Sequence, residues 1–141
     1  MEETKRRTPD LSLRDTFLKA ANGLRRVDGR AAVVGDALEY LQRGFDAHYA
    51  GGGTGDEDIL VGDNAYALAV ETIARLDEPR FVAVAGRMIR DGAGRIAGGG
   101  AVSLEMWTPH LGGLLDIISE EGAEASEARI RAAARELRGQ G

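Results

Sequence analysis

The chain has 141 residues and a net charge of −5, with 43% hydrophobic and 29% charged residues, a balance typical of one soluble globular domain. Because it has no cysteine, disulfides, thiolate metal sites and a cysteine nucleophile are excluded. The acidic charge, with no basic block beyond Lys5–Arg7, argues against nucleic-acid binding, and no apolar run approaches the ~20 residues of a transmembrane segment.

Helical periodicity dominates the sequence. Residues 1–10 are charged and lack the apolar stretch of a secretory signal, so we expect a cytoplasmic protein with a flexible N-terminus. Apolar side chains then recur at three- and four-residue spacing, which indicates helices. We therefore predict an all-α fold, an antiparallel bundle of about six helices in a single domain over residues 11–138, followed by a frayed tail at 139–141. Aromatics at 5% and 20 glycines favour close packing through small side chains.

Caps, glycines and prolines suggest where each helix begins and ends. Ser12 can cap the first helix, and Pro79 suits the first turn of the fourth. Pro109 removes a backbone hydrogen bond, so we expect the fifth segment to start, kink or break there. The predicted helices cover residues 12–28, 31–49, 58–76, 79–96, a fifth segment that ends at 121, and 126–137.

Glycine-rich stretches separate some of these helices. Gly98–Gly100 is a clear break after the fourth helix. Ala50–Gly55 lies between the second and third helices, where a phosphate-binding loop is one interpretation. This stretch lacks the Lys-Ser/Thr ending of a P-loop, so a flexible linker is the favoured interpretation.

The third predicted helix carries the first indication of function. Its stretch Ile59–Ala69, ILVGDNAYALA, resembles the ILAGDYLLALA helix of trans-isoprenyl (polyprenyl) diphosphate synthases. Upstream, Gly35–Glu39 stands near the family's first aspartate-rich motif, Asp-Asp-x-x-Asp, and Gln42–Gly44 near its Arg-Arg-Gly. Downstream, His110–Leu115 parallels its Lys-Thr-Gly-Ala-Leu-Phe segment. The similar pieces follow the family's order over roughly Val33–Leu137, which implies an isoprenoid-synthase-like bundle.

The resemblance implies a magnesium and diphosphate site whose residues are eroded here. The family bridges magnesium ions to an allylic diphosphate with carboxylates from two aspartate-rich motifs, and the metal neutralises charge on the departing diphosphate. In this chain Gly35 replaces the first aspartate, and the second motif has no counterpart. A residual metal or diphosphate site would consist of Asp36, Glu39, Arg43 and His110, with magnesium as the one cofactor implied. The alternative is that these are solvated surface charges.

A partner is implied by the same resemblance. Some enzymes of the family are heteromers in which a small subunit without intact motifs pairs with a catalytic subunit. The family's pairing surface is centred on the helix that begins with Gly-Asp, and the corresponding interface candidates are Tyr66, Val70, Ile73, Phe81 and Met88. Without the resemblance, the same apolar stripe would be read as core.

Three functions remain open at the level of sequence. The leading hypothesis is a non-catalytic, small-subunit-like relative of polyprenyl diphosphate synthases that forms homo-oligomers or pairs with a catalytic subunit. The second is a reduced enzyme that binds magnesium diphosphate through Asp36, Glu39 and Arg43. The third is a helical interaction protein unrelated to isoprenoids. Inward-facing carboxylates around a central cavity would favour kinship, whereas a packed bundle would favour the third hypothesis.

Overall fold

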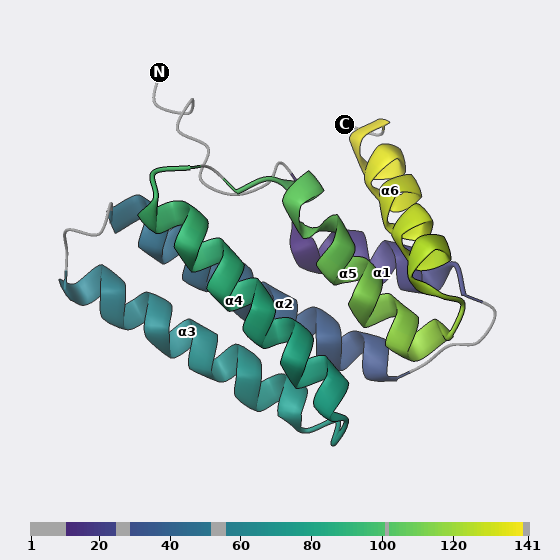
Figure 1. Cartoon of the computed structure of the whole chain (residues 1–141), viewed down its shortest axis with the longest axis horizontal. Helices are drawn as coiled ribbons and strands as arrows, with labels where there is room; N and C mark the ends of the chain where they lie inside the picture. Colours follow the sequence, from purple (N-terminus) through teal and green to yellow (C-terminus); the bar gives the residue numbers. More distant parts are fainter. Residues whose placement is uncertain (1–10, 25–28, 52–55, 101, 140–141) are drawn as a thin grey trace.

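The computed structural model describes residues 11–24, 29–51, 56–100 and 102–139. For residues 48–51 and 56–60 it describes the backbone alone. Within the described ranges the chain forms six helices and no strand (Figure 1). The helices are α1 (Leu13–Asn22), α2 (Arg30–Gly51), α3 (Asp56–Ala74), α4 (Pro79–Ala97), α5 (Leu104–Ser119) and α6 (Ala123–Gly139). The predicted all-α class is confirmed, whereas an isoprenoid-synthase-like arrangement stays a prediction.

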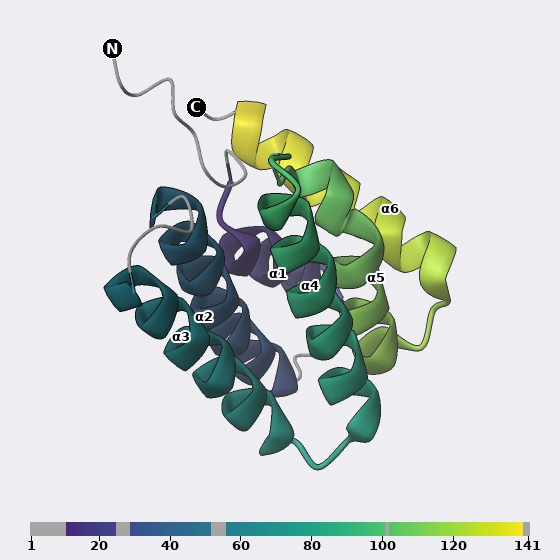
Figure 2. The same cartoon turned by 60° about the vertical axis from the view of Figure 1, so that its left-hand side comes forward.

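Two antiparallel helical hairpins form the frame of the molecule. α2 and α3 lie side by side along most of their lengths, and α5 and α6 form the second pair (Figure 1, Figure 2). α1 packs against α2, α5 and α6, while α4 contacts α2, α3 and α5. The first and fourth helices therefore connect the two hairpins, so that all six helices share one core.

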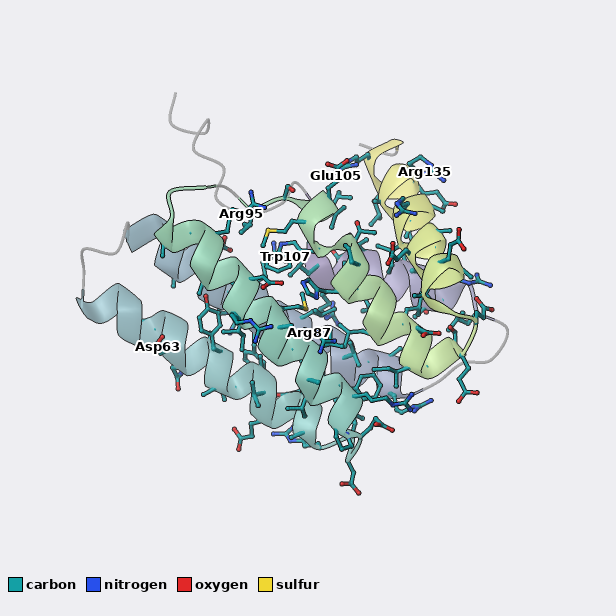
Figure 3. The ribbon with its side chains drawn as sticks, viewed as in Figure 1. Asp63, Arg87, Arg95, Glu105, Trp107 and Arg135 are labelled. Atoms are coloured by element: carbon teal, nitrogen blue, oxygen red, sulfur yellow. The ribbon has the colours of Figure 1, made fainter. Side chains whose placement is uncertain are left out.

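Aromatic side chains occupy the middle of this core. Trp107 of α5 is fully buried and points into the interior (Figure 3). Its ring stacks on that of Phe45 from α2, with centroids 4.9 Å apart, and Phe45 in turn meets the Tyr66 ring of α3 at 5.5 Å. Buried aromatic rings contribute large apolar areas, so this trio is a major contact between the two hairpins.

Glycines let the helices approach closely, as the composition predicts. A Cβ atom on Gly44 of α2 would overlap an aromatic ring of α3. One on Gly92 of α4 would lie 2.5 Å from the Phe45 ring, and one on Gly112 of α5 would lie 3.2 Å from the backbone of α6. These glycines set the spacing of three helix pairs, because any side chain there would have to displace its neighbour.

The starts of α1 to α4 agree with the prediction to within two residues, whereas α1 ends at Asn22 rather than 28, α6 begins at Ala123 rather than 126, and α5 starts well before Pro109. Ser12 caps α1 as expected, accepting a hydrogen bond from a first-turn amide at 2.9 Å. α5 begins at Leu104, capped by Ser103, and continues through Pro109. The Thr108 hydroxyl donates to the Leu104 carbonyl at 3.1 Å. Burial of this apolar first turn outweighs the hydrogen bond that proline cannot form.

Other predictions concern the chain ends and the membrane. In the described ranges, no helix is long and apolar enough to cross a membrane. Gly139, predicted as tail, is the last residue of α6. The predicted flexible N-terminus at 1–10 and the rest of the tail at 140–141 lie outside the described residues.

Candidate functional site

The predicted metal-binding carboxylates lie on the outer surface of α2. Asp36 and Glu39 are one turn apart, and their side chains are 62% and 54% exposed. The Arg14 guanidinium of α1 approaches both carboxylates, with N–O distances of 3.9 Å and 3.6 Å. Arg43, one turn further along α2, pairs with Glu39 at 3.4 Å. The structure thus brings three of the four predicted site residues together, but on the outer surface, where arginines already pair with both carboxylates.

A shallow groove runs beside these residues, between α2 and α3. It encloses about 230 Å³, and its lining residues are Asp36, Glu39, Tyr40, Arg43, Leu68, Thr72 and Arg75. The lining charges cancel, two carboxylates against two guanidiniums. A magnesium ion would have to displace Arg14 from both carboxylates, which makes the groove a poor cation site.

His110, the fourth predicted site residue, is part of a different contact. Its Nε2 atom lies 3.0 Å from Oδ2 of Asp91 on α4, and its ring lies 6.0 Å from that of Trp107. The pair joins α4 to α5. Neither Asp36 nor Glu39 shares this contact, so the four predicted residues do not form one site. Among the residues that the structure describes, no three histidine, aspartate or glutamate side chains gather as metal ligands would.

The predicted dimer interface is largely core, which corrects that interpretation. Tyr66, Ile73, Phe81 and Met88 are at most 8% exposed and pack within the chain's own core. Burial, assisted by the nearby Asp63 charge, also raises the pKa of the Tyr66 phenol. Val70 is half-buried. A second chain could contact the four buried side chains only after the core had opened, because an amphipathic stripe meets its own bundle first.

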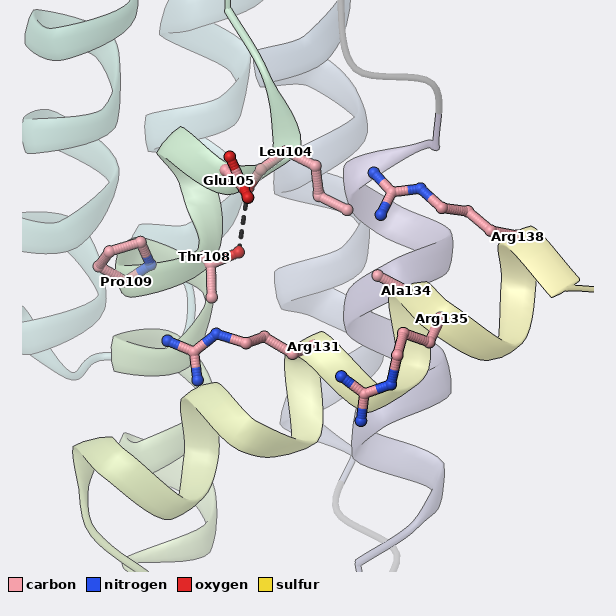
Figure 4. Close-up of a pocket in the computed structure, with 8 residues that line it drawn as sticks. All are labelled: Leu104, Glu105, Thr108, Pro109, Arg131, Ala134, Arg135 and Arg138. Atoms are coloured by element: carbon pink, nitrogen blue, oxygen red, sulfur yellow. Dashed lines mark hydrogen bonds between the residues drawn. The ribbon is translucent and has the colours of Figure 1, made fainter.

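A cleft that was not predicted lies between α5 and α6. It encloses about 420 Å³ (Figure 4). Its lining residues are Leu104, Glu105, Thr108, Pro109, Arg131, Ala134, Arg135 and Arg138. The three arginines share one face of α6, four and three residues apart, a spacing that is visible in the sequence. Only the bounds of this helix, and no site on it, are predicted from the sequence.

Comparison with other proteins adds no family. The chain matches no protein-family model, no curated protein and no solved structure.

The charges on α2 give the first testable prediction. We expect Asp36→Asn and Glu39→Gln each to change the free energy of unfolding by only about 0.2–1 kcal/mol, because the ion pairs are exposed. Urea denaturation monitored by circular dichroism measures this, with and without millimolar magnesium. A magnesium-dependent rise in the unfolding midpoint that disappears in Asp36→Asn would contradict the prediction and restore a metal site.

Proposed function

We propose that the protein is a non-catalytic helical subunit that acts by binding another protein chain. The observation that carries this proposal is the state of the carboxylates on α2, which are exposed and paired with Arg14 and Arg43. Stabilisation of a departing diphosphate requires metal ions and donors preorganised in a site that excludes water. Surface ion pairs supply neither. The filled core supports the same conclusion, because its aromatic side chains occupy the space between the hairpins.

The partner we propose is a catalytic polyprenyl diphosphate synthase subunit or a second copy of this chain. The resemblance motivates this choice and supports a pairing surface on α3. Since the buried side of α3 is occupied by the core, the partner would contact its outer side. Val61 lies there and is 50% exposed, the largest exposure of any large apolar side chain among the described residues. An exposed apolar side chain of this kind is a reasonable centre for a contact.

Two measurements test the proposal. Incubation of the purified chain with magnesium and isoprenoid diphosphates should give no prenyl transfer, with an intact polyprenyl synthase as positive control. Light scattering after gel filtration, of the chain alone and mixed with a polyprenyl synthase subunit, should show a complex. Robust transfer by the chain alone would refute the non-catalytic proposal, and a monomer in both samples would refute pairing.

A pair of variants locates the surface. Val61→Asp should weaken pairing about tenfold, because it places a charge in an apolar contact. Ala128→Asp introduces the same charge at an exposed position of α6 and serves as the matched control. Equal weakening by both variants would indicate a general charge effect and remove α3 from the proposal.

A further inference from the structure

The cleft between α5 and α6 has a cationic lining. Three arginines line it, Arg131, Arg135 and Arg138, against the single carboxylate of Glu105. This positive charge is local, because the whole chain carries a net charge of −5. The α5 residues that line the cleft precede Gly112, where α5 and α6 approach each other closely.

The arginines differ in how they are paired. Arg131 donates to Glu127, one turn earlier on α6, with an Nη2–Oε1 distance of 3.1 Å. Arg135 and Arg138 form no ion pair or hydrogen bond with any other described part of the chain. Figure 4 shows Arg131 and Arg138 extending from α6 toward α5, on either side of Ala134. One guanidinium is thus held in place, and two remain available to a ligand.

A purely structural role explains this row of arginines poorly. Arg138, in the last turn, is favoured by the negative end of the helix dipole, but that effect fades within one turn and does not reach Arg131. Like charges four residues apart, as at Arg131 and Arg135, repel each other and destabilise a helix. A bound anion would remove that repulsion.

From this arrangement we propose that the α5–α6 cleft binds a small phosphate monoester. A phosphate monoester carries a charge of about −1.5 to −2 at neutral pH and presents three acceptor oxygens. Guanidinium groups bind such oxygens through paired N–H donors, and residues three apart are neighbours on the surface of a helix. The volume of about 420 Å³ is that of a small-molecule site. Pro109 and the edges of Leu104 and Ala134 would contact the organic part of the ester.

The experiment is a titration followed by NMR, with phenyl phosphate as the probe. Binding should shift the arginine side-chain signals of α6 and saturate. Arg135→Ala with Arg138→Ala should raise the Kd at least tenfold. Glu105→Gln should lower the Kd several-fold, because it removes the opposing charge from the cleft. All three positions are exposed, so the variants should fold as the original does.

A matched control removes the same amount of charge elsewhere. Arg87 and Arg90 are exposed, lie three residues apart on α4, and form no ion pair within the described chain. Figure 3 shows Arg87 and Arg135 on separate helices. Arg87→Ala with Arg90→Ala should leave the Kd for phenyl phosphate unchanged. Equal weakening by both double variants would overturn the site in favour of general charge attraction.

Other sources of the same charge are separate arms of the titration. Vesicles with an anionic phospholipid test a lipid headgroup, and a triglutamate peptide tests an acidic protein segment. Tighter binding of either one than of phenyl phosphate would overturn the small-molecule proposal, as would the absence of saturable phenyl phosphate binding. The inference does not depend on the pairing proposed for α3, because that surface and this cleft lie on different helices.

Discussion

Trp107→Ala should lower the free energy of unfolding by about 3–5 kcal/mol, the range for removing a large buried aromatic side chain. Trp107 is fully buried and stacks on Phe45 at a centroid distance of 4.9 Å and an interplanar angle of 13°. Truncation would remove this contact between α5 and α2 and leave a cavity between the hairpins. Urea denaturation followed by far-ultraviolet circular dichroism measures the loss, since the variant lacks the chain's one tryptophan.

A second substitution separates ring packing from the indole N–H group. The Nε1 atom of Trp107 is buried and finds no hydrogen-bond acceptor among the described residues. Trp107→Phe therefore sacrifices no hydrogen bond there and keeps an aromatic ring on Phe45, so we expect a loss of about 1–2 kcal/mol. If phenylalanine were as damaging as alanine, an interaction of Nε1 with another group would be indicated, and the packing argument would fail.

Gly92→Ala should destabilise the protein by about 1–3 kcal/mol, although alanine is normally the better helix former. The new Cβ atom would lie 2.5 Å from the Phe45 ring and 2.8 Å from the Trp107 ring. Both rings are fully buried and stacked on each other, so neither can move aside without disturbing the core. The expected measurement is a lower urea midpoint with an unchanged slope, which indicates a change in stability alone.

Two glycines on the same helix provide the control. A Cβ atom on Gly86 or Gly94 would meet no atom within 4 Å. Gly86→Ala and Gly94→Ala should each stabilise the protein by about 0.5–1 kcal/mol, because alanine restricts the unfolded chain and suits a helix. The opposite signs of these changes in the free energy of unfolding test whether α4 approaches the core closely at Gly92. If all three variants were stabilising, the predicted overlap between a Cβ atom at Gly92 and the buried rings would be contradicted.

Local signals in the sequence account for much of the fold. Ser12 and Pro79 start their helices as predicted, because caps and first-turn prolines act within a few residues. The start of α5 differs from the prediction because the helix is capped by Ser103 and continues through Pro109. Whether a helix continues through a proline depends on what its first turn buries, and Leu104 is buried by contacts that only the folded chain provides.

The candidate sites depended on long-range contacts that no local pattern contains. Arg14 lies more than twenty residues before the carboxylates it pairs with, so the neutralisation of Asp36 and Glu39 could not be read from their own helix. Periodicity revealed the apolar stripe of α3 but could not distinguish an interface from the core that buries Tyr66. Likewise, the arginine row of α6 is visible in the sequence, whereas the cleft beside it depends on how α5 and α6 cross.

The contact of α1 with α6 has a consequence for biosynthesis. Lys19 pairs with Glu136 at 3.2 Å, and the Arg129 side chain donates to the Gly23 carbonyl across 106 residues. At about 5–20 residues per second, a ribosome needs on the order of 5–20 s to make the chain between these partners. During that interval the apolar side of α1, including Phe17, can be covered by α2 but not by α6. The nascent chain therefore presents an incomplete core, the kind of surface that chaperones bind, until α6 leaves the exit tunnel.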